Sequence, residues 1–288
     1  MPQSRTRGWL ETLAAWVFIA LPHHLLSRLV FHLTRLRGPL APWMIRWFIR
    51  TYRVDMSEAA NDQATAFPTF NQFFTRELRD GARPVVEGQS RLASPVDGTV
   101  SQFGTIQHDH LFQAKNQCYS VEELLGGDRL LANMFSGGRF ATIYLAPYNY
   151  HRIHMPLDGQ LKKMVHVPGR LFSVAPWTVR RIPRLFARNE RVVCLFSTAA
   201  GPMAMILVGA INVAAIETTW HGLVTPPRGR RISSYDYSHG STQIDKGQEM
   251  GRFNMGSTVI LLTTDQVEWC NLAEQHPVRM GQEIGLHR

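Results

Sequence analysis

The sequence has few cysteines, and their spacing excludes the frameworks that cysteines usually build. Three occur in 288 residues, at Cys118, Cys194 and Cys270, and none belongs to a C-x-x-C pair. An odd number of distant cysteines fits neither a disulfide-stabilised secreted domain nor a zinc ribbon. We therefore expect reduced cysteines in a cytosolic setting, most of them acting as small core side chains.

Long hydrophobic runs are also missing. The longest apolar stretch, residues 13–21, is about half the ~20 residues that a helix needs to span a bilayer. Arg5 and Arg7 in front of it resemble the start of a signal peptide, but the sequence LPHH at residues 21–24 offers no small-residue cleavage site. The sequence predicts neither a spanning helix nor a cleaved signal.

Acidic residues are fewer than basic ones, which gives a formal net charge of +9 at pH 7. Such a surface favours an anionic partner, either nucleic acid or the anionic face of a membrane. Near the N-terminus the basic residues alternate with Trp, Phe and Leu, which suits a lipid interface better than a phosphate groove. We therefore expect an anionic membrane surface as a partner, and no nucleic acid.

Residues 1–53 form the predicted membrane-associating helical segment. After Pro22, leucines recur at helical spacing between basic residues, and residues 43–50 again mix aromatics with arginines. Two interpretations stay open. Amphipathic helices could lie in the headgroup layer, or a helical cap could pack its apolar face on the core. The first interpretation predicts peripheral attachment to the cytoplasmic face of the cell membrane.

After a polar connector at residues 54–90, short apolar runs are separated by Gly, Pro and Asp turns. The strand-like runs lie at residues 98–101, 140–145, 192–196, 205–208 and 259–262. Neither an internal repeat nor a long βαβ alternation is visible. The pattern predicts an α+β fold in which N-terminal amphipathic helices pack on a mainly antiparallel β core, sandwich-like or barrel-like. Residues 54–288 would form one catalytic domain.

Two common catalytic signatures are absent. The pair His151-x-x-His154 lacks the glutamate of a zinc-protease H-E-x-x-H motif, and His108-x-His110 is too weak to complete a ligand set. We expect no metal site, and we interpret the pair as acid–base groups, since imidazole titrates near neutrality. The hydrolase signature G-x-S-x-G is missing around Ser257.

The pair Gly256-Ser257 stands directly before an apolar run, and by itself it predicts a turn before a buried strand. A serine there can also attack the preceding carbonyl, because glycine has no side chain to obstruct it. That reaction needs a base. Asp97 in a turn, a histidine and Ser257 come from three distant segments and could form a charge-relay set, which depends on geometry and not on chain order.

Six segments together resemble the phosphatidylserine decarboxylases, in particular their bacterial membrane-associated branch. They are FFTREL at residues 73–78, SPVDG at 94–98, HRIHMP at 151–156, LFARNER at 185–191, KGQEMG at 246–251 and MGST at 255–258. The resemblance runs in order from about residue 70 to residue 260. One departure is Met255, where the branch commonly has leucine, and this change keeps an apolar side chain.

The resemblance implies a self-processing carboxy-lyase of phospholipid biosynthesis that is made as a zymogen. Asp97 would orient His154, and His154 would take the proton from Ser257 as it attacks the carbonyl of Gly256. Autocatalytic cleavage would leave a large chain, residues 1–256, and a small chain, residues 257–288, whose first residue is a pyruvoyl group. The two chains would stay together as a heterodimer, and association beyond it stays open.

The resemblance also implies the reaction. The pyruvoyl ketone would form a Schiff base with the amino group of phosphatidylserine and withdraw electrons as carbon dioxide leaves, giving phosphatidylethanolamine. His151 would return a proton to the carbanion, with His154 as the second candidate. Two alternatives stay open: an enzyme for another seryl-headgroup lipid or a small amino acid, and a basic peripheral scaffold protein with a silent site.

Overall fold

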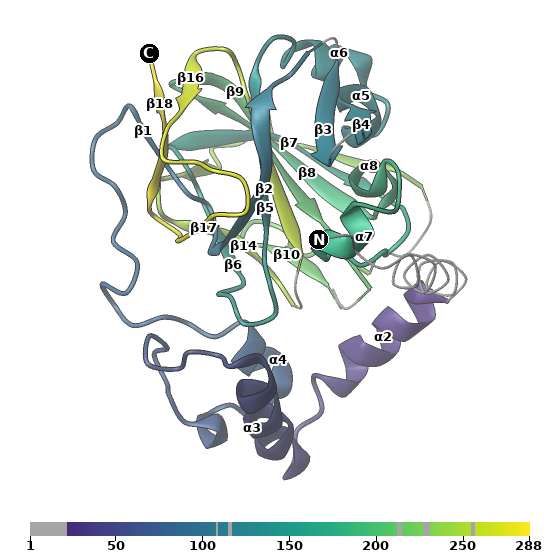
Figure 1. Ribbon diagram of the computed structural model, residues 1–288, viewed down its shortest axis with the longest axis vertical. Helices are drawn as coiled ribbons and strands as arrows, with labels where there is room; N and C mark the ends of the chain where they lie inside the picture. The colour runs from purple at the N-terminus through teal and green to yellow at the C-terminus, as the bar shows by residue number, and fades with distance from the viewer. Residues whose placement is uncertain (1–21, 108, 115–116, 212–214, 227–230, 255–256) are drawn as a thin grey trace, which may run out of the picture.

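The computed structural model of the chain describes residues 22–107, 109–114, 117–211, 215–226, 231–254 and 257–288 (Figure 1). The apolar run at residues 13–21 and the arginines before it lie outside the described residues. So do His108, Met255 and Gly256. Of the two residues that form the expected scissile bond, the structure therefore describes only Ser257.

Two long helices occupy the N-terminal part of the described chain, α2 (His23–Leu33) and α3 (Leu40–Tyr52). Gly38, with a φ of 147°, and Pro39 separate them, because glycine adopts a backbone that other residues avoid. The shorter helices are η1 (Ala64–Ala66), α4 (Phe70–Phe74), α5 (Val121–Leu124), α6 (Arg129–Asn133), α7 (Pro176–Val179) and α8 (Leu185–Arg188).

A nine-stranded antiparallel sheet forms the centre of the molecule, in the order β12-β7-β8-β9-β15-β5-β2-β17, with β13 also paired to β7. Its strands are β2 (Gly98–Thr105), β5 (Arg139–Tyr144), β7 (Gly159–Val167), β8 (Arg191–Thr198), β9 (Gly201–Val208), β12 (Ser233–Asp236), β13 (Gln243–Ile244), β15 (Thr258–Thr263) and β17 (Pro277–Val278). The strands that follow the sequence predictions therefore pair at the middle of one sheet.

Three smaller antiparallel sheets complete the β structure. A four-stranded sheet has the order β11-β10-β14-β6, a three-stranded sheet the order β1-β18-β16, and β3 pairs with β4. Their strands are β1 (Arg91–Ala93), β3 (His110–Ala114), β4 (Gln117–Ser120), β6 (Arg152–His154), β10 (Ile216–Thr218), β11 (Gly222–Leu223), β14 (Glu249–Phe253), β16 (Val267–Trp269) and β18 (Glu283–His287). The predicted α+β fold with an antiparallel core is confirmed, but its main sheet is open and not a closed barrel.

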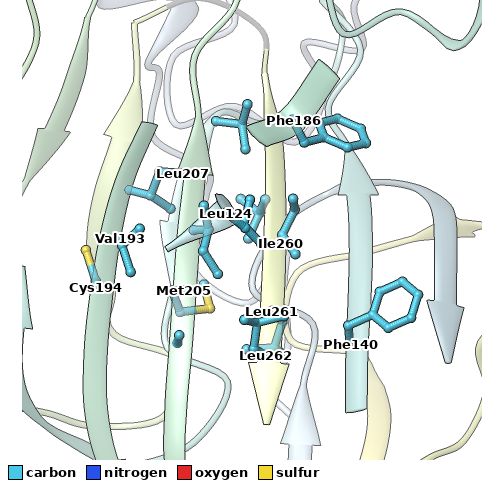
Figure 2. Close-up of a cluster of buried hydrophobic side chains, with 14 of the residues drawn as sticks. Leu124, Phe140, Phe186, Val193, Cys194, Met205, Leu207, Ile260, Leu261 and Leu262 are labelled. Atoms are coloured by element: carbon cyan, nitrogen blue, oxygen red, sulfur yellow. The ribbon is translucent and has the colours of Figure 1, made fainter. Parts of the chain in front are cut away.

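The central strands are buried on both faces, which explains why they read as continuous apolar runs instead of alternating ones. On one face Phe196 of β8 meets Trp220, next to β10, in an edge-to-face contact at 6.0 Å. Side chains from the short helices also pack on the sheet. Figure 2 shows Leu124 of α5 and Phe186 of α8 in one buried cluster with Ile260 of β15. Burying each such side chain stabilises the fold by about 1.5–3 kcal/mol.

A second, smaller core joins α3 to the chain that follows it. Phe48 of α3 makes edge-to-face contacts with Phe70, Phe73 and Phe74 of α4 at 5.1–6.0 Å. Thr69 caps α4, which begins inside the segment expected to be a polar connector, by accepting a hydrogen bond from the Gln72 amide at 3.2 Å. This aromatic cluster links the N-terminal helices to the edge of the β core (Figure 1).

Candidate active site

Ser257 lies directly before β15, the strand held between β9 and β5, and its side chain is fully buried. Its carbonyl accepts a hydrogen bond from the Leu145 amide at 2.8 Å. Its hydroxyl donates to the carbonyl of Val208 at the end of β9. The strand predicted after Gly256 is therefore confirmed, and it fixes the serine between the ends of two neighbouring strands.

His154 closes β6, and two hydrogen bonds define its tautomer. Its Nδ1 lies 2.8 Å from the carbonyl oxygen of Gly247, and its Nε2 lies 3.0 Å from the hydroxyl of Tyr150. A carbonyl only accepts, so Nδ1 carries the proton and Nε2 presents a lone pair to the tyrosine O–H. Burial lowers the pKa of His154, although the Gly247 carbonyl opposes that shift. The ring is therefore a neutral base with Nε2 as its basic atom.

Asp97 lies in the turn between β1 and β2, and a salt bridge holds it there. Arg83 donates from Nε to Oδ1 at 2.8 Å and from Nη2 to Oδ2 at 2.6 Å. The amide of Met280 donates to the same Oδ1 at 2.8 Å. This accounts for three hydrogen bonds to one buried carboxylate.

Asp97, which the resemblance implies orients His154, makes no hydrogen bond with its ring, because both nitrogens of His154 are bonded elsewhere. The two residues are nevertheless close. The amide of His154 donates to the carbonyl of Pro95 at 2.8 Å, and the negative charge of Asp97 is one of the influences that raise the pKa of His154. In this structure Asp97 acts on His154 through charge, while Gly247 and Tyr150 orient the ring.

His151 is fully buried and stacks on Phe74, with ring centroids 4.1 Å apart and planes at 23°. Burial, and then the positive charge of Arg76, lower its pKa to about 3, although the backbone at Pro147 and Ala146 partly opposes the shift. Within the described residues neither ring nitrogen makes a hydrogen bond of ordinary geometry. Buried polar atoms without partners are rare and call for an explanation, such as a bound water or substrate.

The segments that carry these residues run side by side. β6 pairs with β14, and the Phe253 amide, at the end of β14, donates to the carbonyl of His151 at 3.0 Å. From there the chain continues through Asn254 to Ser257. The Oδ1 atom of Asn254 is also buried without a partner among the described residues. Asp97, His151, His154 and Ser257, all chosen from the sequence, thus belong to one region.

A cavity of about 90 Å³ adjoins this region. Leu145, which bonds the Ser257 carbonyl, and Phe74, which stacks on His151, both line it. The other lining residues come from α3, from the last residue of β5 and the chain after it, and from two loops: Phe48, Tyr52, Tyr144, Pro147, Ser173, Val174, Ala175, Ala210 and Ile211. The cavity is far smaller than the several hundred Å³ of pockets that enclose whole ligands. Only a small group fits inside it.

Two of the sequence motifs build the frame of the site. Arg152 donates to the carbonyl of Thr75 at 3.0 Å, to Glu77 at 3.0 Å and to Glu249 at 2.8 Å, which ties three segments together. Asn189 bonds both the amide and the carbonyl of Phe172 and also the carbonyl of Gly209. These contacts hold the chain segments that line the cavity.

Sequence reasoning missed three partners in the site: Arg83, Tyr150 and Gly247. Tyr150 could have been noticed, because it stands beside His151 and four residues before His154. Nothing in the pattern around Arg83 indicates that it reaches Asp97, fourteen residues along the chain. In the described part of the chain, no group of three or more His, Cys, Asp or Glu side chains is arranged to hold a metal ion.

Comparisons with known proteins agree with these motifs. The sequence model of the family described as phosphatidylserine decarboxylase matches residues 70–286, and a second model, described as PSD, matches residues 13–53. A phosphatidylserine decarboxylase proenzyme of Pseudomonas fluorescens is 54% identical over 275 residues, covering 92% of this chain and 94% of the relative. The proenzyme of Alkalilimnicola ehrlichii is 54% identical and covers 96% of both chains, and that of Pseudomonas aeruginosa PAO1 is 52% identical over 92% and 94%.

Proposed function

The chain belongs to the family of phosphatidylserine decarboxylases, and we propose that it reaches its active form by cutting its own backbone between Gly256 and Ser257. The enzyme is a carboxy-lyase that converts phosphatidylserine into phosphatidylethanolamine and carbon dioxide. Its relatives carry the name proenzyme, which implies processing before activity. The observation that carries the proposal is a fully buried serine directly before β15, in the same region of the fold as a histidine whose Nδ1 donates to the Gly247 carbonyl.

Self-cleavage begins when the hydroxyl of Ser257 turns away from the carbonyl of Val208 and the hydroxyl of Tyr150 releases Nε2 of His154. The freed Nε2 then takes the proton of Ser257. The freed oxygen attacks the carbonyl carbon of Gly256, the C–N bond breaks, and the Ser257 nitrogen takes the proton, which leaves an ester. Loss of the proton on Cα of Ser257 then expels the Gly256 carboxylate and leaves a dehydroalanine. Its imine form takes up water and releases ammonia, so that residue 257 becomes a pyruvoyl group. Each step conserves atoms and needs no outside oxidant.

The surroundings of Ser257 fit a small electrophilic carbonyl at this position. The cavity beside Leu145 has room for a small group, and polar atoms of His151 and Asn254 that find no partner among the described residues belong to the same region. When formed, the pyruvoyl carbonyl supplies an electron sink for decarboxylation. His151 is the proposed proton donor to the product carbon, and Phe74 fixes its ring plane by stacking.

After cleavage the two chains stay together as a heterodimer, and the strand pairing supports this. β15 of the small chain, residues 257–288, pairs with β9 and β5 of the large chain, residues 1–256. β17 pairs with β2, and β18 with β1. The cut lies before Thr258, where the ladders of β15 begin, so it breaks none of them. The small chain then stays held on both sides of β15.

We also propose that the substrate is reached at a membrane surface. Helix α2 buries the polar side chains of His23 and Ser27, whereas its leucines Leu25, Leu29 and Leu33 are 46–66% exposed. A helical cap on the core would bury its apolar face, so this orientation favours the headgroup-layer interpretation. Trp43 and Trp47 of α3 are also exposed. No helix in the described part of the chain is long and apolar enough to cross a membrane.

The mass of the purified protein tests the proposal. We expect two chains on a denaturing gel, the smaller beginning at a blocked residue 257 that reacts with carbonyl reagents, together with release of carbon dioxide from phosphatidylserine. Assays with free serine and with another seryl-headgroup lipid distinguish the substrate alternatives. A single uncleaved species of 32.7 kDa that lacks decarboxylase activity would support the scaffold alternative instead.

A further inference from the structure

A group of arginines outside the N-terminal helices gathers on the segment that ends with α8. Arg170, Arg184 and Arg188 are all exposed. The amide of Arg170 donates to the carbonyl of Arg188 at 2.8 Å, and the amide of Arg188 donates to the carbonyl of Arg184 at 3.0 Å, so the three residues are neighbours in the fold. Burial, and then repulsion from Arg184 and Arg170, lower the pKa of Arg188. This basic surface, defined by these three residues, takes no part in the mechanism described above.

The negative charge available to the basic surface is small. Arg184 pairs with Glu123 at 2.7 Å, but both side chains are largely exposed, and such pairs contribute little. In the ranges that the structure describes, no carboxylate forms a salt bridge with Arg170 or Arg188. Arg188 lies instead over the ring of Phe172, 4.9 Å from its centroid. The surface therefore keeps a net positive charge that an external anion can neutralise.

The basic surface adjoins both the exposed leucines and the cavity. His24 of α2 donates from Nε2 to the carbonyl of Gly169 at 2.9 Å, directly before Arg170. His23 meets Phe172 edge to face at 5.6 Å. The next residues along the chain, 173–175, line the cavity beside Ser257. Figure 1 shows α7 and α8 near the upper end of α2.

We propose that Arg170, Arg184 and Arg188 bind the phosphate groups of anionic phospholipids when α2 lies in the headgroup layer. This interaction deepens the membrane association under "Proposed function" and rests on it. The exposed leucines attach the protein to any bilayer, whereas the arginines favour anionic bilayers. The arginines also fix how the whole protein is rotated about the axis of α2 on the membrane. Guanidinium groups suit this task because they bind phosphate oxygens with two parallel hydrogen bonds. The rotation turns the 173–175 wall of the cavity toward the lipid headgroups.

The test compares two triple variants of the full-length protein. One is Arg170→Gln with Arg184→Gln and Arg188→Gln, and the matched control, which removes the same charge elsewhere, is Arg91→Gln with Arg129→Gln and Arg288→Gln. Binding is measured by flotation with phosphatidylcholine vesicles and with vesicles of phosphatidylcholine and phosphatidylglycerol, at low and high salt. Self-cleavage reports that each variant folds.

A basic residue near an anionic membrane contributes roughly fivefold in affinity, so the triple variant should lose on the order of 100-fold on anionic vesicles. High salt should remove most of this difference. Binding to phosphatidylcholine alone should stay unchanged, as should both bindings in the control. Arg170→Gln alone should lose roughly fivefold and keeps the test decisive if the triple variant fails to fold.

Two outcomes would overturn the inference. One is a loss no larger than that of the control, and the other is an equal loss on phosphatidylcholine vesicles, which would indicate a damaged apolar contact. Decarboxylation of detergent-dispersed phosphatidylserine is measured in parallel. If no variant and no wild-type protein decarboxylates, the proposed function fails. The vesicle comparison still judges the basic surface on its own.

Discussion

Arg83 forms a bidentate salt bridge with both carboxylate oxygens of Asp97. The Arg83 side chain is only 7% exposed and that of Asp97 only 8%. The same guanidinium also reaches Glu58 at 2.7 Å, and Glu58 in turn pairs with Arg279 at 3.1 Å. The hydrogen bonds to Asp97 raise the pKa of Arg83. The carboxylate is therefore held by two parallel hydrogen bonds close to His154 without a hydrogen bond to that ring.

We expect Arg83→Leu to be strongly destabilising, because it leaves Asp97 buried with the Met280 amide as its remaining hydrogen-bond donor. Breaking a buried pair by removing one partner typically costs about 3–5 kcal/mol. Arg83→Lys keeps the positive charge but loses the two parallel hydrogen bonds of the guanidinium. Its stability should therefore lie between those of the wild type and Arg83→Leu. Urea unfolding in a Ser257→Ala background, where every variant is one chain, measures the loss.

The matched control for Arg83 is Arg91→Leu, which removes a half-exposed arginine from its pair with the partly exposed Glu283. That change should cost at most about 1 kcal/mol. In proteins that keep Ser257, we also expect Arg83→Leu to slow self-cleavage and Arg91→Leu to leave its rate unchanged. If Arg83→Leu unfolds at the same urea concentration as Arg91→Leu, Asp97 does not depend on this salt bridge.

Tyr150→Phe should move the acid limb of the self-cleavage rate to higher pH. The tyrosine O–H donates to Nε2 of His154 and so stabilises the neutral ring. Without that donor the pKa of His154 rises, and since the base works in its neutral form, the rate starts to fall at a higher pH. The measurement is the rate of chain cleavage against pH after rapid purification.

Tyr148→Phe is the control for Tyr150, because Tyr148 is 49% exposed and its hydroxyl does not contact His154. An acid limb that stays in place in Tyr150→Phe would mean that the tyrosine hydroxyl does not govern His154. A shift of both variants would indicate an indirect effect of the chain after β5.

The sequence predicted the strand after Gly256 and the residues of the site better than it predicted the contacts between them. Apolar runs identify buried strands such as β15 because burial on both faces demands apolar side chains throughout. The link from Asp97 to Arg83 depends on tertiary packing, and no local spacing encodes it. The same holds for Gly247, whose contribution is a backbone carbonyl and not a side chain.

The orientation of α2 shows a different limit of sequence reasoning. Its leucine spacing predicts an amphipathic helix, and both open interpretations share that spacing. Only the structure shows which face is turned outward, with Ser27 buried and Leu25 exposed. Periodicity gives the relative positions of side chains around a helix. Tertiary packing decides whether the row of leucines faces the protein or the solvent.

His151→Ala should reduce turnover by about 10²–10⁴-fold while leaving self-cleavage intact, as expected for the loss of a general acid. At neutral pH the unliganded ring is neutral, because its pKa is about 3. An anionic substrate would favour the protonated ring and so prepare the donor. The assay compares carbon dioxide release with the fraction of cleaved chain.

His154→Ala is the reciprocal variant and should block cleavage, so that no small chain appears. If His151→Ala blocks cleavage while His154→Ala permits it, the roles of the two histidines are reversed. Ser257→Ala should give one uncleaved chain without decarboxylase activity. A cleaved and active Ser257→Ala protein would contradict the whole mechanism.

The buried His151 also predicts a loss of stability in acid. Its pKa falls from 6.5 to about 3 on folding, so below pH 6.5 the unfolded chain binds a proton that the folded chain does not. The stabilisation is complete above pH 6.5 and is lost progressively as pH falls toward 3. Between neutral pH and about pH 5 this amounts to about 2 kcal/mol.

His151→Phe should remove that part of the acid sensitivity, whatever its effect on stability at neutral pH. The comparison is the change in unfolding free energy between neutral pH and about pH 5, measured with and without the substitution in the Ser257→Ala background. His154 titrates in both proteins and cancels. Equal changes in the two proteins would show that the buried ring is already protonated or becomes solvated.

The exposed leucines of α2 predict a membrane contact that differs from the basic surface in its salt dependence. Replacing Leu25, Leu29 and Leu33 by Gln should weaken binding to neutral and anionic vesicles alike, on the order of 100-fold. Full burial of a leucine contributes about 1.5–3 kcal/mol, and these side chains are 46–66% exposed, so the membrane can supply roughly half of that contribution for each. The loss should persist at high salt, because apolar burial is not screened. The matched control replaces three exposed leucines outside the N-terminal helices, Leu130 of α6, Leu223 of β11 and Leu286 of β18, and should bind as the wild type does. Equal binding by both triple variants would show that α2 does not enter the headgroup layer.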